Sequence, residues 1–242
     1  MNPPTKVPVA APRRVRGRLA QAPDGPLRVV HRGPHSIYLD LDGWCLGVVD
    51  AGAAQVPCAL RAVSLAGLAG ERAEITGGVL HLDGVPVPVG RVVEVAVRRL
   101  APGSGSAPVE SADPGLVAWA AEQVGRGDGL TPYGDDVLCG WLAIHRAAGV
   151  ATPRMDAAVR ALLHRTTLLS ATLLDCAMHG EVLPQFAAWV GALGTPGEPE
   201  AAAALASVGH TSGRGLLAGA RRGVEDLGED LGVEDLGVED LG

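Results

Sequence analysis

Polar side chains that could do chemistry interrupt the apolar second half of the chain in three clusters. The first is a glycine-rich loop, residues 125–136, which ends in the neighbouring carboxylates Asp135 and Asp136. Thr131 followed by a proline is typical of a helix start, and acidic residues in a first turn favour the helix dipole, so a well-capped helix explains the segment. Adjacent residues of a helix point to different sides, so one carboxylate could instead face a cleft and hold an amide or a metal ion.

The second cluster, residues 164–170, places Thr166 and Ser170 on one face of a predicted helix. Arg165 beside them carries a guanidinium group, which can bind a carboxylate or a phosphate through two parallel hydrogen bonds. Hydroxyls in helices also bond the carbonyl one turn earlier, so a purely structural interpretation of this cluster stays open.

The third cluster, residues 209–213, sets His210, Thr211 and Ser212 between two glycines directly before a predicted helix. N–H groups at a helix start, together with two hydroxyls, could hold an anion. An ordinary Ser or Thr cap is the alternative. Because buried polar groups need partners, we expect the three clusters to meet in one site of the helical half.

The first half of the chain is expected to fold as short strands. Seven β-rich runs are separated by turn signals such as the Asp-Gly pair at 42–43, and the prolines in the sixth run restrict it to a sheet edge. The predicted strands are 27–32, 36–41, 44–49, 74–76, 79–82, 85–89 and 92–98. Residues 59–68 between them predict a short helix. Together these features predict a small, β-barrel-like half.

Beyond residue 113 the apolar period becomes helical. Helices are predicted at 114–124, 135–148, 155–163, 166–178, 183–193, 200–207 and 214–222. The fold class is therefore α+β, an N-terminal β-barrel-like half followed by a C-terminal helical half. The expected parts are an N-terminal extension at 1–26, whose arginines form a solvated lead-in, a β-rich half at 27–100, a linker at 101–113, a helical half at 114–223 and a tail at 224–242.

The tail repeats Val-Glu-Asp-Leu-Gly and holds eight acidic residues and no basic one. Self-repulsion and frequent glycines oppose helix formation, so we expect the tail to be disordered and its deletion to leave the melting temperature nearly unchanged. Removing its eight acids would change the net charge from −7 to +1. A nearly neutral remainder argues against a nucleic-acid partner, which would need a basic face.

No apolar stretch approaches the roughly 20 residues of a membrane helix. The four cysteines show neither CxxC nor CxH spacing, so free buried thiols are expected in place of disulfides or a zinc cluster. Asp175 and His179, one helical turn apart, are interpreted as a surface ion pair. These features are typical of a soluble, cytoplasmic protein without a membrane or nucleic-acid partner.

Residues 129–136, 165–170 with the Gly-Glu pair at 180–181, and 209–213 resemble the three signature blocks of a domain-of-unknown-function family. That family is named for AllH, a subunit of oxamate carbamoyltransferase in anaerobic allantoin breakdown. The resemblance covers roughly residues 27–222 and is strongest after 115. Asp128 stands where the family usually has proline, and Tyr133 where it usually has a small residue, so the mouth of this loop is expected to be reshaped.

The resemblance implies transfer of a carbamoyl group between phosphate and the nitrogen of a small amide such as oxamate. Such a reaction needs an anion cradle, donors for the carbamoyl oxygen and an acceptor for the amide protons. The implied catalytic residues are Asp135, Asp136, Thr166 and Thr167. The implied substrate- or anion-binding residues are Gly129, Thr131, Arg165, Ser170, His210, Thr211, Ser212 and Gly213. No metal ligands are assigned, although Mg²⁺ on the aspartate pair is kept as a cofactor hypothesis.

Three classes of function stay open. The chain could be a carbamoyltransferase subunit that works with partner subunits on a small carbamoyl or amide metabolite. It could be a non-catalytic or regulatory subunit that binds a small anionic metabolite. It could also be a metal-dependent hydrolase that uses the aspartate pair.

Overall fold

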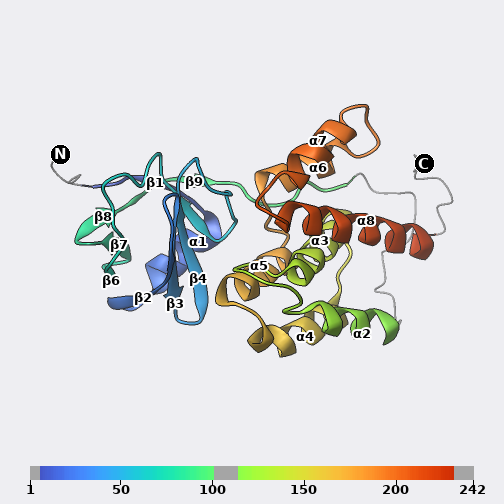
Figure 1. Ribbon diagram of the computed structural model, residues 1–242, viewed down its shortest axis with the longest axis horizontal. Coiled ribbons are helices and arrows are strands. Elements are labelled where there is room, and N and C mark those ends of the chain that lie inside the picture. Colours follow the sequence, from blue (N-terminus) through green and yellow to red (C-terminus); the bar gives the residue numbers. More distant parts are fainter. Residues whose placement is uncertain (1–5, 101–113, 232–242) are drawn as a thin grey trace. The chain divides into compact units, whose positions relative to one another are not determined.

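The computed structural model describes residues 6–100 and 114–231 of the chain (Figure 1). The chain divides into two compact units between Val95 and Ala96. A β-rich unit precedes the division and a helical unit follows it, which confirms the α+β prediction. The predicted linker at 101–113 and residues 232–242 of the predicted tail lie outside the described residues.

The β unit is built on a nearly closed, barrel-like sheet, which has nine strands within the described residues. These strands are β1 (Val9–Pro12), β2 (Gly25–Arg32), β3 (Ser36–Leu41), β4 (Trp44–Val49), β5 (Ala59–Arg61), β6 (Ala73–Thr76), β7 (Val79–Leu82), β8 (Val85–Val87) and β9 (Val89–Val93). They lie in the order β8-β7-β6-β2-β3-β4-β5-β1-β9. The β1–β9 and β4–β5 pairs are parallel, and the other pairs are antiparallel.

Local sequence sets the tight turns of this sheet. Between β3 and β4, Asp42 and Gly43 have φ values of 51° and 75°. Positive φ at both central residues matches the twist of a two-residue hairpin and favours Asp-Gly, so the predicted turn is confirmed. Strand β8 lies at one end of the sheet order, as its proline predicts. Beside it, the Val7 N–H donates to the carbonyl of Pro86 at 2.9 Å, which helps to bring the sheet ends together.

Several segments of the β unit differ from the prediction. The strand predicted at 85–89 is divided between β8 and β9, and the strand predicted at 92–98 ends at Val93. The helix predicted at 59–68 is wrong, because Ala59–Arg61 form β5 in parallel with β4 and residues 62–68 are not helical. Ala59 and Leu60 are both fully buried, and a short apolar run buried on both faces fits a strand inside a sheet. The predicted extension at 1–26 contains both β1 and a helix, so these residues belong to the β unit.

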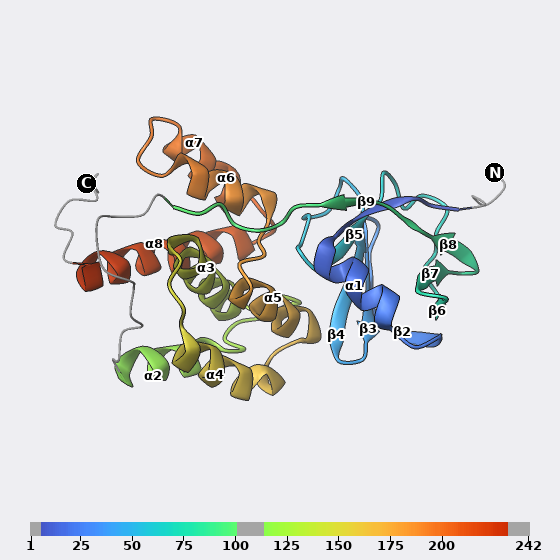
Figure 2. The same ribbon diagram turned by 180° about the vertical axis from the view of Figure 1, so that it is seen from behind.

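That helix, α1 (Arg13–Gln21), explains the arginine run (Figure 2). Val15 and Leu19 are one turn apart and buried, while Arg14 and Arg18 place their guanidinium groups 5.8 and 4.6 Å from the centre of a Trp44 ring. Cation–π contacts and two apolar anchors therefore hold α1 in the unit. The expectation of a solvated lead-in is wrong.

The helical unit contains all the helices that the sequence predicts. They are α2 (Pro114–Gln123), α3 (Tyr133–Ala148), α4 (Pro153–Leu162), α5 (Leu168–Met178), α6 (Pro184–Ala192), α7 (Glu198–Ala206) and α8 (Ser212–Leu231). A short 3₁₀ helix, η1 (Leu163–Arg165), separates α4 from α5. Helix α3 is buried at every residue from Gly134 to His145, so it is the central helix of this unit.

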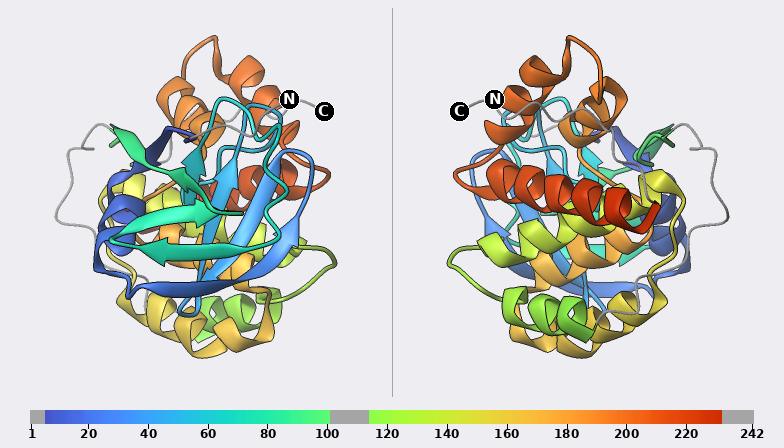
Figure 3. Two further views of the ribbon diagram at one scale, coloured as in Figure 1. Left: turned by 90° about the vertical axis from the view of Figure 1, so that its left-hand side faces the viewer. Right: turned by 90° about the vertical axis from the view of Figure 1, so that its right-hand side faces the viewer.

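Glycines bring α3 and α8 into close contact, and Figure 3 shows the two helices side by side. A Cβ atom on Gly219 of α8 would lie 1.8 Å from the Val137 carbonyl oxygen, and one on Gly140 of α3 would lie 2.0 Å from that of Leu216. Real Cβ atoms do not approach so closely, so this packing needs glycine at both positions. Helix α8 therefore lies along α3, the helix that contains the aspartate pair.

Helix α8 continues eight residues beyond Gly223, to Leu231, so the prediction of disorder is wrong for residues 224–231. The Trp141 indole N–H donates to Asp226 at 2.6 Å, and Leu227 is buried at 6% exposure. One buried leucine and one hydrogen bond to a core tryptophan therefore anchor the first acidic repeat to the helical unit.

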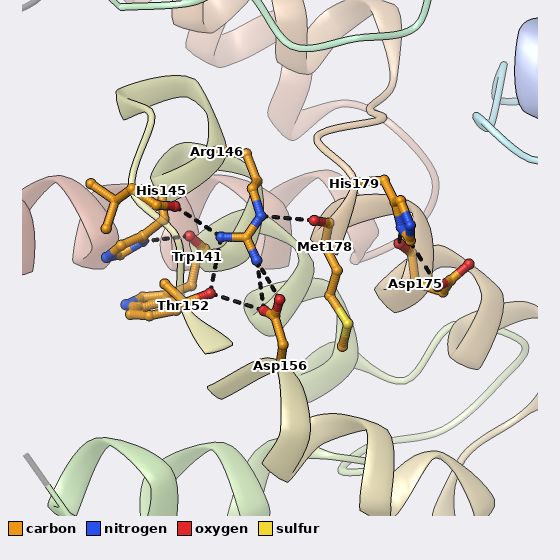
Figure 4. A network of polar contacts seen from close by, with 9 residues as sticks. Trp141, His145, Arg146, Thr152, Asp156, Asp175, Met178 and His179 are labelled. Carbon is orange, nitrogen blue, oxygen red and sulfur yellow. Dashed lines mark hydrogen bonds and ion pairs between the residues drawn. The ribbon is translucent and has the colours of Figure 1, made fainter. Parts of the chain in front are cut away.

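A partly buried guanidinium group ties α3 to α4 and α5 (Figure 4). Arg146 donates to both carboxylate oxygens of Asp156 at 2.6 and 2.7 Å, to the Met178 carbonyl at 2.7 Å and to Thr152 at 3.0 Å. A bidentate, fully hydrogen-bonded arginine fixes helix ends relative to one another. It has a structural role that sequence periodicity alone does not show.

In the same view, His179 Nδ1 lies 2.7 Å from the Asp175 backbone oxygen and 3.6 Å from its carboxylate. The predicted pairing of these two residues is therefore confirmed. All four cysteines are buried thiols that form no disulfide, also as predicted. Among the described helices, none has the length and apolar character needed to cross a membrane.

Candidate functional site

Asp135 joins the first cluster to the second. Its Oδ1 accepts a hydrogen bond from the Gly125 N–H at 2.8 Å, and its Oδ2 accepts one from the Thr166 hydroxyl. Asp135 is 1% exposed, so both carboxylate oxygens are held by protein donors away from water. The carboxylate closes the glycine-rich loop onto the segment that precedes α5.

Asp136 and Thr131 join the first cluster to the third. The Ser212 hydroxyl hydrogen-bonds the Asp136 carboxyl group, and Ser212 Oγ lies 2.8 Å from Thr131 Oγ1. Residues 81 positions apart in the chain thus touch because α8 packs along α3. The three clusters meet in the helical unit, as expected from their polarity.

We call Thr131, Asp135, Asp136, Thr166 and Ser212 the carboxyl–hydroxyl cluster. Thr167 lies next to it and has a separate role, because its hydroxyl donates to the Leu130 carbonyl at 2.6 Å and accepts from the Ser170 N–H at 3.1 Å. Thr167 is therefore the N-cap of α5 and also fixes the loop.

The protons of the four hydroxyls follow from these contacts. Thr166 donates to Asp135, and Thr167 donates to Leu130. With Asp136 ionised, Ser212 donates to it, so Thr131 must donate to Ser212, since each hydroxyl has one proton. Above the pKa of Asp136, where its carboxylate is ionised, all four protons are therefore committed within the protein; when Asp136 is protonated, either Thr131 or Ser212 can be the donor of their shared hydrogen bond.

One acceptor of the carboxyl–hydroxyl cluster is left over. Asp136 is 4% exposed, and its Oδ2 is buried without a hydrogen-bond partner. An unsatisfied buried polar atom costs free energy, and in native proteins it calls for an explanation such as a bound group. Burial raises the pKa of Asp136 to about 7, the Asp135 charge adds to this, and the Ser212 hydrogen bond opposes it.

Several residues assigned to anion binding lie elsewhere or are already occupied. Arg165 is exposed and donates to the Ala121 carbonyl at 3.0 Å. The Gly213 N–H donates to the Val208 carbonyl at 2.9 Å, and the His210 carbonyl accepts from the Arg214 side chain at 2.8 Å. Ser170 is buried at 1% exposure and contacts Thr167 through its backbone.

Close packing and backbone conformation explain the glycines of the three clusters. A Cβ atom on Gly125, where φ is +75°, would lie 2.4 Å from the Arg165 carbonyl oxygen. One on Gly213 would lie 1.9 Å from that of Leu205. Gly129 has a φ of +86° and open space around its Cα, so it serves the loop's conformation. Close helix packing, which spacing in the sequence does not reveal, explains Gly213 without any ligand.

The residues of the cluster do not fit a resident magnesium ion. Mg²⁺ prefers six oxygen ligands in an octahedron, and Asp135 already uses both oxygens as hydrogen-bond acceptors. Only Asp136 Oδ2 remains on the aspartate pair. Across the described residues, no group of three or more His, Cys, Asp or Glu side chains is placed to hold a metal ion.

One protein family matches this part of the chain. Residues 123–224 match the AllH family, described as oxamate carbamoyltransferase subunit AllH. The match spans the loop, α3 and most of α8, and so contains every residue of the carboxyl–hydroxyl cluster. The match confirms the resemblance in the helical unit. It does not extend to residues 27–122, which the resemblance also covered. No curated protein and no solved structure matches the chain.

The sequence did not show which residues of the three clusters pair. Thr131 and Asp136 both contact Ser212, and neither pairing has a local spacing signal because the contact depends on α8 lying along α3. The glycines at 215, 219 and 223 recur every four residues and were the available signal for close packing of this helix.

Proposed function

We propose that this chain is an AllH-like subunit of an oxamate carbamoyltransferase-type enzyme, and that it binds a small carbamoyl or amide metabolite at the carboxyl–hydroxyl cluster. One observation carries the proposal. Three separate motif segments inside the family match come together around the aspartate pair, in which Asp136 is a buried carboxyl group with an unpaired oxygen. Buried, perturbed carboxyl groups of this kind concentrate at functional sites.

The proposed reaction moves a carbamoyl group between a small amide such as oxamate and phosphate. In the direction of breakdown, the bond between the carbamoyl carbon and the amide nitrogen breaks, a bond to a phosphate oxygen forms, and a proton goes to the nitrogen. Asp136 would bind the N–H group of the amide, and its near-neutral pKa suits it to hold that proton. Asp135 positions the loop, because both of its oxygens are occupied.

A non-catalytic binding subunit is the second candidate, and the committed hydroxyl protons favour it. Carbamoyl transfer needs donors for the oxygen on which negative charge develops. Thr166 and Thr167 were assigned that role, yet they donate to Asp135 and Leu130. Under this alternative the donors come from a partner subunit, and this chain holds the metabolite.

A ligand screen followed by an activity assay tests the proposal. Melting curves of the full chain would be recorded with oxamate, carbamoyl phosphate, phosphate and Mg²⁺, each at millimolar concentration. Carbamoyl transfer would then be assayed with the chain alone and with added partner subunits. A melting shift by oxamate with turnover only in the complex supports the enzyme subunit. A shift without turnover in any combination supports the binding subunit, and no shift and no turnover contradict both.

A further inference from the structure

We infer that the carboxyl–hydroxyl cluster selects the N–H end of its ligand, and that the phosphate or carboxylate end is held outside this cluster. This inference rests on the proposed function and adds the chemical group that the site recognises. It differs from the prediction from sequence that the third cluster holds an anion.

The hydrogen-bond donors of the cluster are used up. Thr166 donates to Asp135. With Asp136 ionised, Ser212 donates to Asp136, and Thr131 then donates to Ser212. An anion is held by donors, and each of these hydroxyls has a single proton. Turning Ser212 or Thr166 toward an anion would leave a buried carboxylate without its donor, which costs more than an exposed hydrogen bond returns, and turning Thr131 away would break its hydrogen bond with Ser212.

The remaining capacity of the cluster is that of an acceptor. Asp136 Oδ2 is buried and unpaired, and the lone pairs of a carboxylate accept N–H or O–H groups. A primary amide or carbamoyl nitrogen offers two such hydrogens. An amide N–H on Oδ2 would therefore satisfy the one polar atom of the cluster that the protein leaves open.

The charges of the cluster also favour a ligand whose N–H end faces Asp136. The cluster contains two carboxyl groups, and the Asp135 charge already acts unfavourably on Asp136. Arg165, the arginine that the sequence predicts to bind an anion, is exposed and donates to the Ala121 carbonyl. A phosphate or carboxylate oxygen in contact with the Asp136 carboxylate would meet like charge, whereas the amide end of a ligand such as oxamate places its N–H group there and its carboxylate farther away.

Oxamate and oxalate provide a matched pair of probes for this inference. They differ only in that an amide of oxamate is replaced by a carboxylate in oxalate. We expect millimolar oxamate to raise the melting temperature of the full chain by about 5 °C if it is well above its Kd. Oxalate and phosphate are expected to give less than a fifth of that shift.

Two variants distinguish hydrogen bonding by Asp136 from the effect of removing one negative charge from the loop region. Asp136→Asn replaces the acceptor with a group of the same shape that carries an NH₂, so the oxamate shift should fall at least fivefold. Asp128→Asn makes the same chemical change at an exposed position of the same loop and should keep the full shift. If Asp136→Asn does not fold, the oxamate–oxalate comparison on the unmodified chain still decides.

Equal shifts with oxalate or phosphate would overturn the inference, as would an oxamate shift that survives in Asp136→Asn. The absence of any shift would also overturn it. In each of these cases, carbamoyl transfer by the chain with its partner subunits would show that the chain is still a carbamoyltransferase subunit, but that Asp136 does not hold the amide. Loss of both binding and transfer would reject the two together.

Discussion

At the scale of single residues, Asp136 is the group whose environment departs most from that of an ordinary surface acid. It lies in the first turn of α3, next to Asp135 and in contact with Ser212 of α8, and burial raises its pKa to about 7. The neighbouring carboxylates Asp135 and Asp136 therefore have different roles. Asp135 is a fixed structural acceptor, and Asp136 keeps one oxygen available.

The raised pKa of Asp136 makes stability depend on pH. Between about pH 4 and 7 the folded protein holds a proton that the unfolded chain has released, so the free energy of unfolding falls as pH rises through this window. The groups that act on Asp136 are Asp135 and the Cys139 thiol on the same helix and the hydroxyl of Ser212 on α8. In Asp136→Asn this contribution disappears.

Urea unfolding at pH 5 and pH 8 would measure the effect. The unmodified chain should lose more stability between these pH values than Asp136→Asn does, with a difference on the order of 1–4 kcal/mol. Asp128→Asn serves as the control because its carboxylate is exposed. An identical pH dependence in the unmodified chain and Asp136→Asn would show that Asp136 ionises normally.

At the scale of secondary-structure elements, the α3–α8 contact decides whether the site exists. Gly219 has no room for a Cβ atom, since the Val137 carbonyl oxygen would be 1.8 Å away. We expect Gly219→Ala to force the helices apart and lower the free energy of unfolding by roughly 2–4 kcal/mol.

Gly191→Ala in α6 is the matched control, because its added Cβ atom would lie 3.7 Å from the nearest atom, an ordinary contact. It should be neutral or stabilise by up to about 1 kcal/mol, as alanine favours a helix over glycine. Equal stability of Gly219→Ala and the unmodified chain, measured by denaturant unfolding, would contradict the packing described for α8.

The elements also show how far the sequence predicts this fold. Turns such as Asp42-Gly43 and the helix of residues 133–148 were predictable, because backbone conformation and apolar period are local signals. Strand β5 and helix α1 were not predictable. The three residues of β5 and the two apolar anchors in α1 are too few to show a strand or helix period in the sequence. The meeting of the clusters followed from polarity, whereas the pairing of Ser212 with Thr131 and Asp136 depends on the tertiary contact of α8.

At the scale of the whole molecule, the acidic repeat is partly a structural element. Helix α8 includes its first copy, with Asp226 bonded to Trp141 and Leu227 buried. Deleting residues 224–242 should therefore lower the melting temperature by several degrees, in contrast to the expectation from sequence.

Truncation after Leu231 is the control for that deletion, because it keeps every described contact of α8. Thermal unfolding of the two truncated chains, compared with the full chain, would separate the docked repeat from the residues that follow it. The expected order is a clear drop for the chain that ends at Gly223 and a smaller change for the one that ends at Leu231. Equal melting temperatures would show that the docked repeat does not contribute to stability.

The division of roles proposed for the complete enzyme follows from the site in the helical unit and from the family match. The matched residues lie in the helical unit, and there the site offers an acceptor for an amide and no spare hydroxyl donor for an anion. Partner subunits would then supply the groups that hold phosphate and stabilise the carbamoyl oxygen.

The most direct test of the central claim is the rate of carbamoyl transfer by the chain assembled with its partner subunits, measured for the unmodified chain, Asp136→Asn and Asp128→Asn. If the carboxyl–hydroxyl cluster holds the reacting amide, Asp136→Asn should lower kcat/KM for oxamate by about a hundredfold or more, while Asp128→Asn stays within about twofold. An Asp136→Asn complex that transfers the carbamoyl group with unchanged kcat and KM would contradict the account.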